Sequence, residues 1–170
     1  MDVAAELDCH AVRANVSPGA KQPVTPAEID AFLGHAAESF ARLCEYAKGR
    51  AINVIIENHG GISSNADVVV RLMKRVNLPN FGTLPDFGNF PKEADKYEGV
   101  RKLMPFAKGV SFKCYDFDAQ HRETTIDMDK MMPIVLGAGY NNWIGIEYEG
   151  ERLTEFEGIQ AAKICLEKYL

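Results

Sequence analysis

The feature that most constrains the fold is a strand-like segment followed by a helix-like segment, repeated five times along the chain. Parallel strands cannot be joined by a tight turn, so a helix normally crosses between consecutive strands. This repeat therefore predicts an α/β fold with a parallel sheet. The chain has 170 residues, of which 46% are hydrophobic, and contains neither a linker nor a low-complexity segment. We expect one domain over residues 1–170.

Hydrophobic periodicity and turn residues place the individual elements. The expected strands cover residues 9–16, 52–56, 80–86, 109–115 and 143–149. A short helical tail is expected at 2–7, a loop at 17–24, and helices at 25–48, 68–76, 92–106, 127–136 and 154–169. Two of these helices start with a capping box, which pairs Thr25 with Glu28 and Thr154 with Glu157. For the helix at 68–76, Ser64 and Asp67 are the candidate caps.

The second strand carries the most informative motif, Ile-Asn-Val-Ile-Ile-Glu-Asn-His-Gly-Gly at residues 52–61. Its apolar, β-branched start is typical of a buried strand. Glu57 and His59 are two residues apart, so on a strand they lie on the same face. In α/β folds, ligands bind at the carboxyl ends of parallel strands. The motif therefore indicates a functional site at this end of the sheet.

Polar residues recur at the ends of four expected strands. The pairs are Glu57/His59, Asp86/Asn89, Ser111/Lys113 and Glu147/Glu149. Carboxylates from several strands would repel one another on one rim unless a cation lies among them. A divalent metal with oxygen ligands is the simplest such cation.

Each of these residues also has an ordinary structural explanation. Glu57 or Glu147 could pair with Arg13 or Lys113, and Asp86 could cap a turn. A single histidine such as His59 is more often hydrogen-bonded within the fold than bound to a ligand. The residues alone leave these alternatives open.

Composition limits the other classes of function. The net charge of −5 and the absence of a Lys/Arg cluster argue against nucleic-acid binding. No apolar run approaches the length of a membrane span, and the N-terminus lacks a signal-peptide pattern. Four widely spaced cysteines are typical of reduced thiols. We expect a cytoplasmic protein with neither a nucleic-acid nor a membrane partner.

Four motifs, spread in order over nearly the whole chain, strongly resemble the xylose-isomerase-like superfamily of sugar phosphate isomerases and epimerases. They are Ile-Glu-Asn-His-Gly-Gly (56–61), Pro-Asp-Phe-Gly-Asn (85–89), Val-Ser-Phe-Lys-Cys-Tyr-Asp-Phe-Asp (110–118) and Gly-Ile-Glu-Tyr-Glu-Gly (145–150). Members are (β/α)₈ TIM barrels. The resemblance implies a partial barrel here, with five strand–helix units corresponding to strands four to eight.

The resemblance also implies a site. Many members hold one divalent metal, often Mn²⁺, Mg²⁺ or Co²⁺ with Zn²⁺ less favoured here, through a Glu, an Asp, a His and a Glu. By position the metal ligands are Glu57, Asp86, Ser111 in place of the His, and Glu147. Glu57 and Glu147 would also be the catalytic acid and base. His59, Asn89, Lys113 and Arg13 would contact the substrate, a small sugar or sugar phosphate.

The chemistry implied for such a site is proton transfer next to a carbonyl through an enediolate. A complete barrel runs about 250 residues, so the first three strand–helix units are expected to be missing. Exposed sheet edges favour pairing with other chains. We therefore expect a homo-oligomer or a complementing N-terminal barrel fragment as partner.

Two other hypotheses compete with a sugar isomerase or epimerase. The apurinic-site endonuclease branch of the superfamily uses several zinc ions and many histidines. This chain has four histidines and an acidic charge, which argue against that branch. An inactive barrel remnant acting as a binding or structural module is favoured by Ser111 and by the missing strands. Metal content after purification would separate the remnant from the enzyme.

Overall fold

Five parallel strands form the centre of the computed structural model, which describes residues 1–16 and 22–170. They are β1 (Ala11–Arg13), β2 (Asn53–Glu57), β3 (Phe81–Leu84), β4 (Val110–Cys114) and β5 (Ile144–Tyr148). β1, β2 and β3 form a three-stranded sheet, and β4 and β5 form a two-stranded sheet. Two parallel bridges, Thr83 to Ala107 and Asp86 to Ser111, link the two sheets, so the strands lie side by side in chain order.

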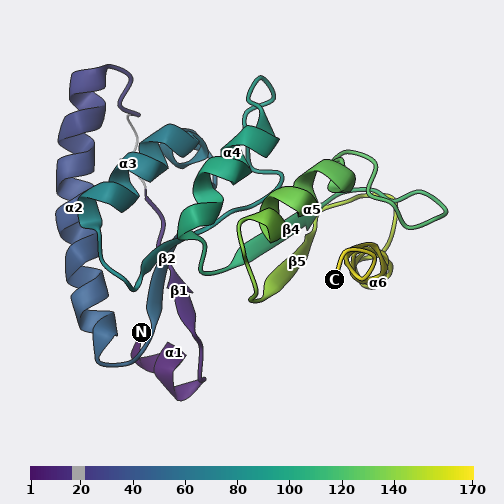
Figure 1. Cartoon of the computed structure of the whole chain (residues 1–170), viewed down its shortest axis with the longest axis horizontal. Helices are drawn as coiled ribbons and strands as arrows, with labels where there is room; N and C mark the ends of the chain where they lie inside the picture. The colour runs from purple at the N-terminus through teal and green to yellow at the C-terminus, as the bar shows by residue number, and fades with distance from the viewer. Residues whose placement is uncertain (17–21) are drawn as a thin grey trace.

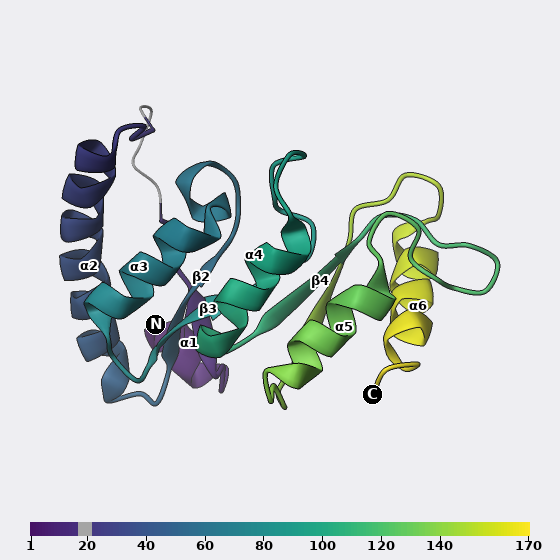
Figure 2. The ribbon, with the colours of Figure 1, turned by 45° about the horizontal axis from the view of Figure 1, so that its top comes forward.

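The longer helices form a layer on one face of these strands. They are α2 (Pro26–Lys48), α3 (Ala66–Val76), α4 (Lys96–Leu103), α5 (Met128–Gly137) and α6 (Glu155–Leu166). Figure 2 shows them in a row in chain order, and Figure 1 shows the short α1 (Asp2–Glu6) below β1. Two short 3₁₀ turns, η1 (Gly61–Ser64) and η2 (Met104–Phe106), complete the elements. This is the architecture of part of a (β/α)₈ barrel.

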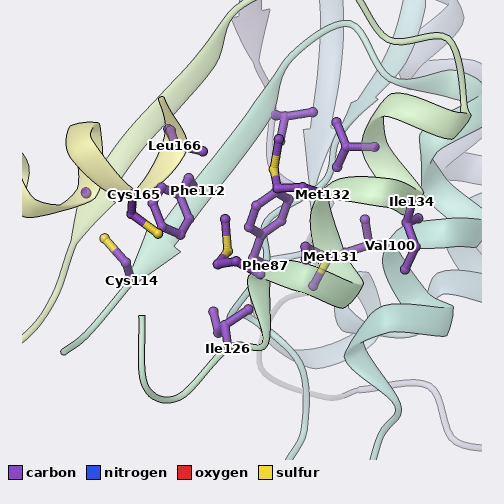
Figure 3. Packing of buried hydrophobic residues seen from close by; sticks show 14 of the residues in the cluster. Phe87, Val100, Phe112, Cys114, Ile126, Met131, Met132, Ile134, Cys165 and Leu166 are labelled. Atoms are coloured by element: carbon purple, nitrogen blue, oxygen red, sulfur yellow. The ribbon is translucent and has the colours of Figure 1, made fainter. Parts of the chain in front are cut away.

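Two hydrophobic clusters fill the space between the strands and the helices. One joins α2 and α3 to β2, and includes Leu33 and Ile56. The other joins α5 and α6 to β4, with Phe112 and Met131 fully buried in it (Figure 3). α4 belongs to both clusters, since its Leu103 packs in the first and its Val100 in the second.

Alternation along the strands separates a core face from a polar face. In β4, Val110, Phe112 and Cys114 pack in the core, so the residues between them, Ser111 and Lys113, point to the opposite face. Glu57 follows the core residue Ile56 on β2, and therefore shares this second face. The register also pairs Lys113 directly with Glu147 of β5. The fold thus gathers polar side chains on the face that the helices do not cover.

Most of the expected elements are confirmed. All five expected strands are present. β2 (Asn53–Glu57) is shifted one residue from the expected 52–56, β1 has only three residues where 9–16 was expected, and β3 spans Phe81–Leu84 where 80–86 was expected. The capping boxes of α2 and α6 are both present. Of the expected loop at 17–24, residues 17–21 lie outside the described part of the chain.

Two helix starts were predicted wrongly. α3 is capped by Asn65, whose side chain accepts hydrogen bonds from the backbone N–H of Asp67 and Val68, because Ser64 belongs to η1. α4 begins after Asp95 and not at residue 92, since the Asp95 carboxylate caps its first turn. In the described residues, no helix combines the length and the apolar character needed to cross a bilayer.

Two glycines give a test of the packing. Alanine at Gly150 would place its Cβ 1.7 Å from the Tyr115 carbonyl oxygen, whereas nothing lies within 4 Å of a Cβ at Gly34 in α2. We expect Gly150→Ala to lower the free energy of unfolding by about 3 kcal/mol through this overlap. The matched change Gly34→Ala should raise it by about 0.5–1 kcal/mol, because glycine is a poor helix former. Urea melts measure both, and equal effects would contradict the packing described here.

Candidate metal centre

Three carboxylates converge at the carboxyl ends of the strands. Glu57 ends β2, Asp86 follows β3, and Glu147 lies near the end of β5. One carboxylate oxygen from each lies within 4.8 Å of the others. Glu57 and Asp86 are buried, at 3% and 0% exposure, and Glu147 is half-buried. Like charges this close and this buried repel one another, so compensation must come from nearby groups.

Both oxygens of Glu57 and both of Glu147 have partners on the protein. Arg13 forms an ion pair with Glu57 Oε2, and Asn89 Nδ2 donates to Glu57 Oε1 at 3.1 Å. Lys113 Nζ lies 3.3 Å from Glu147 Oε1, and the Ser111 hydroxyl donates to Glu147 Oε2 at 3.1 Å. The ion pairs that the residue types allowed as ordinary structural explanations are therefore both present.

Asp86 is only half satisfied. Its Oδ1 accepts hydrogen bonds from the backbone N–H groups of Gly88 and Asn89, at 2.8 and 2.7 Å, so it does cap a turn. Its Oδ2 is buried and has no hydrogen-bond partner among the residues described. Burial raises the pKa of Asp86 to about 6, although the hydrogen bonds from the two backbone N–H groups partly offset this. A buried acceptor without a donor is costly, and it is the feature here that an ion would satisfy.

Two asparagines hold the loop after β3 in place. Asn58 is buried, and its side chain bonds Asp86 from both sides: Nδ2 donates to the Asp86 carbonyl at 2.9 Å, and Oδ1 accepts from the Asp86 N–H at 2.8 Å. Asn89 lies between the two ends of the site, because its Nδ2 donates to Glu57 while its Oδ1 accepts from Lys113 Nζ at 3.0 Å. Together they fix the position of the Asp86 carboxylate relative to Glu57.

His59 and Arg13 lie further out, and both are exposed. Among the described residues, the group of possible metal ligands holds Glu57, Asp86 and Glu147 without His59, so the His59 imidazole does not take the place of the histidine that the resemblance predicts at Ser111. His59 instead borders a cavity of about 330 Å³ that Glu57 also lines. Asn15 and Gln22 contribute amide groups to the same cavity. A polar cavity beside one of the carboxylates is a suitable place for a small polar ligand.

The donor set fits a hard divalent ion. Oxygens around an octahedral Mg²⁺ at about 2.1 Å lie about 3.0–4.2 Å from one another, and the three carboxylate oxygens lie within 4.8 Å of one another, which is close to this spacing. Glu57, Asp86 and Glu147 could each supply one oxygen. Ser111, the fourth predicted ligand, is 6% exposed and directs its hydroxyl to Glu147. The three carboxylates without an imidazole favour oxygen-preferring ions.

A comparison with protein-family profiles identifies the family of this chain. The profile of the xylose isomerase-like TIM barrel matches residues 1–169. The chain belongs to this family. A comparison with curated protein sequences finds no match.

Solved structures with a similar fold include three informative examples. The IOLI protein, crystallised with a bound zinc atom, is 17% identical over 99% of this chain and 67% of its own, with a TM-score of 0.76. A D-tagatose 3-epimerase-like protein is 20% identical, with coverages of 99% and 64% and a TM-score of 0.72. A family 2 AP endonuclease from Brucella melitensis is 21% identical, with coverages of 93% and 62% and a TM-score of 0.71. This family member therefore spans about 62–67% of the length of these structures, and the likeness shows the fold.

Some residues of the site were not predicted from the sequence. Asn58 was not predicted as a site residue. It lies inside the Glu-Asn-His motif, directly after the apolar residues of a buried strand, and this position was the available signal in the sequence. Glu149 was seen only as part of a strand end, yet it accepts a hydrogen bond from Lys113 Nζ at 3.0 Å. Gln22, which accepts a hydrogen bond from the Ile62 N–H at 3.1 Å, carried no sequence signal.

Replacing Asp86 by asparagine should separate metal binding from stability. Burial raises the pKa of Asp86 from 3.8 to about 6, so the folded state binds the proton more tightly than the unfolded state. The resulting contribution to the stability of the fold is fully present below pH 3.8 and is lost as the pH rises through 6. Asp86→Asn keeps the Oδ1 acceptor and carries no charge. In EDTA at pH 8, its free energy of unfolding should be up to about 3 kcal/mol higher than that of the parent, and this difference should disappear near pH 4.

The same variant should lose Mn²⁺ binding in calorimetric titrations at pH 8. The two hydrogen bonds between the Asn58 side chain and Asp86 are made to the Asp86 backbone. The substitution leaves them in place, so its effect is limited to the carboxylate. A variant that is less stable than the parent at both pH values, or that binds Mn²⁺ as the parent does, would show that Asp86 is not a destabilised carboxylate that binds the ion.

Proposed function

We propose that this family member acts as a metal-dependent sugar or sugar phosphate isomerase or epimerase, with Glu57, Asp86 and Glu147 as the metal ligands. The observation that carries the proposal is the buried, unpartnered Oδ2 of Asp86 between two other carboxylates. The polar cavity beside Glu57 supports it, because a small polyhydroxylated ligand needs such a space next to the reacting groups.

Glu57 and Glu147 are the proposed acid and base, and they come from strands on the two sides of Asp86. One carboxylate removes the proton from the carbon next to the substrate carbonyl. The electron pair of that C–H bond forms the carbon–carbon double bond of an enediolate, and the carbonyl electrons move to oxygen. The other glutamate, which enters the cycle protonated, donates its proton to a carbon of the enediolate and is left as the carboxylate, so one glutamate gains the proton that the other gives up. A bound divalent ion supplies positive charge that stabilises the developing oxyanion.

The remaining predicted residues divide into two groups in this proposal. His59 and Arg13 are exposed and can reach hydroxyl or phosphate groups of a substrate. Asn89 donates a hydrogen bond to Glu57, Lys113 forms an ion pair with Glu147, and the two side chains are hydrogen-bonded to each other, so both act through the carboxylates that they hold. Mn²⁺, Mg²⁺ and Co²⁺ are the proposed ions, since the available ligands are oxygens.

Isosteric glutamine variants test the catalytic assignment. The protein loaded with Mn²⁺ is incubated in D₂O with a panel of free and phosphorylated ketoses, and loss of the proton next to the carbonyl is followed by NMR. Glu57→Gln and Glu147→Gln should each slow the exchange by about 100-fold or more, because each removes a group that accepts or returns the proton.

The control is Glu151→Gln, which makes the same chemical change at an exposed residue beyond β5 and should leave exchange unchanged. Exchange at the parent rate in both site variants would contradict the assignment. A parent that binds Mn²⁺ but exchanges no proton from any ketose would favour the inactive binding module.

Assembly follows from the sheet edges. In the described residues, β1 pairs only with β2 and β5 only with β4, so each keeps one free edge. Trp143, directly before β5, is 76% exposed, and Phe156 in α6 is 73% exposed. Free edges and exposed apolar side chains both favour association. We propose that further strands pair with these edges, from a second copy of the chain or from a separate polypeptide.

Light scattering behind a sizing column measures this directly. The chain alone should elute as a species heavier than its own 18.8 kDa, because the two edges and the exposed apolar residues are then covered. It should also bind a dye that reports exposed apolar surface when diluted. A monodisperse 18.8 kDa species without dye binding would contradict the assembly proposal.

A further inference from the structure

The charges around the three carboxylates do not balance. Within the described residues, Glu57, Asp86 and Glu147 are joined by Glu149, which forms an ion pair with Lys113. The cations that contact this group are Lys113 and Arg13, with Arg13 at the exposed rim. Four carboxylates thus face two cations.

Lys113 is the buried member of the pair of cations. It is 2% exposed, and its Nζ has three acceptors: Asn89 Oδ1 at 3.0 Å, Glu149 Oε1 at 3.0 Å and Glu147 Oε1 at 3.3 Å. The first two contacts are hydrogen bonds and the third is an ion pair, so the ammonium has an acceptor for each of its three N–H donors. Its side-chain stem lies against Gly88, where an added Cβ would come within 3.0 Å of Lys113 Cγ. The ammonium is therefore held in one position.

That position is close to where an ion would lie. Lys113 stands two residues beyond Ser111 on β4, on the same face, and directly opposite Glu147. It bonds Glu147 directly, and it reaches Glu57 through the side chain of Asn89. A single ammonium group thus connects two of the three carboxylates that a divalent ion would connect.

We propose that Lys113 is a positioning residue that serves as a built-in counter-cation: it keeps the carboxylates together when no ion is bound, and it weakens the binding of a divalent ion at the same carboxylates. The inference rests on the metal site of the proposed function. Glu147 Oε1 is shared between the two cations, so an ion must bind against the repulsion of the ammonium or push it towards Glu149. Glu149, whose side chain is 49% exposed, can hold the ammonium in either case.

Lys113→Met tests the proposal because the two effects have opposite signs. In EDTA the variant should melt at a lower temperature than the parent, since the carboxylates lose their internal cation. In calorimetric titrations it should bind Mn²⁺ about tenfold or more tightly, because a neighbouring charge shifts the affinity of a carboxylate for a cation such as the proton by about one to three decades. The matched control is Lys74→Met, which removes the same charge from an exposed position on α3 and should change neither value.

Further variants keep the test decisive. Lys113→Gln removes the charge but keeps hydrogen-bond donors, so it should show the same tightening if Lys113→Met does not fold. Lys113→Met combined with Glu57→Gln should lose the tight binding, which places the ion at the three carboxylates. A purely structural lysine would give lower melting temperatures with unchanged or weaker Mn²⁺ binding, and that result overturns the proposal.

The outcomes also separate this inference from the proposed function. Parent protein that binds Mn²⁺ at Glu57, with no tightening in either Lys113 variant, would overturn only the inference. Binding in the variants but not in the parent would support the counter-cation and show that the parent is not a metal enzyme. Absence of binding in all of them would overturn both.

Discussion

Mutual repulsion among carboxylates is the constraint on which the polar end of this fold depends. Glu57, Asp86 and Glu147 lie within 4.8 Å of one another, two of them buried. Burial strengthens repulsion and removes the water that would otherwise relieve it. Two cations and several amide and hydroxyl donors offset part of this repulsion. One Asp86 oxygen is still left without a hydrogen-bond partner among the described residues. That remaining deficit distinguishes the site from an ordinary cluster of ion pairs.

The sheet makes this concentration of charge feasible. Strict alternation on β4 directs Val110, Phe112 and Cys114 into a core that is almost completely buried, and so anchors the strand that carries Ser111 and Lys113. The hydrophobic face supplies stability that the polar face cannot, because burying unpaired charge costs free energy. A weakly paired junction lies at the same place. In the described part of the chain, two isolated bridges join the β3 side of the sheet to the β4 side, and one of them is formed by Asp86 and Ser111.

Much of the fold could be predicted because each strand–helix unit is specified locally. Periodicity identified all five strands, and capping boxes placed the starts of α2 and α6. The start of α3 could not be chosen in this way, since Ser64, Asn65 and Asp67 are all good caps and the turn η1 decides among them. β1 is short because only Ala11–Arg13 lie opposite β2 in register, which is a tertiary property.

The sequence was sufficient to predict which carboxylates lie together in the site. It was not sufficient to predict the hydrogen-bond partners of each one. Motif spacing brought Glu57, Asp86 and Glu147 together, as the structure does. The partner of each oxygen could not be read from spacing, because it depends on side-chain directions across strands. Asn58 shows this most clearly: its two hydrogen bonds to the Asp86 backbone join residues 28 positions apart in the chain. Long-range pairing of this kind leaves no periodic signal in the sequence.

Ion pairing and metal binding are usually treated as alternative explanations of a carboxylate cluster, but here the same geometry favours both. Each carboxylate oxygen has more than one acceptor site, so a hydrogen bond from Asn89 or Ser111 leaves room for an ion on the same oxygen. The sequence resemblance predicts an imidazole at the position of Ser111, and in the proposed metal site a hydroxyl would contribute less to holding an ion. Lys113, two residues along β4, supplies the positive charge on that side of the site. In the proposed metal site, the ammonium of Lys113 would keep the carboxylates assembled without metal, whereas three carboxylates alone would drive the strands apart.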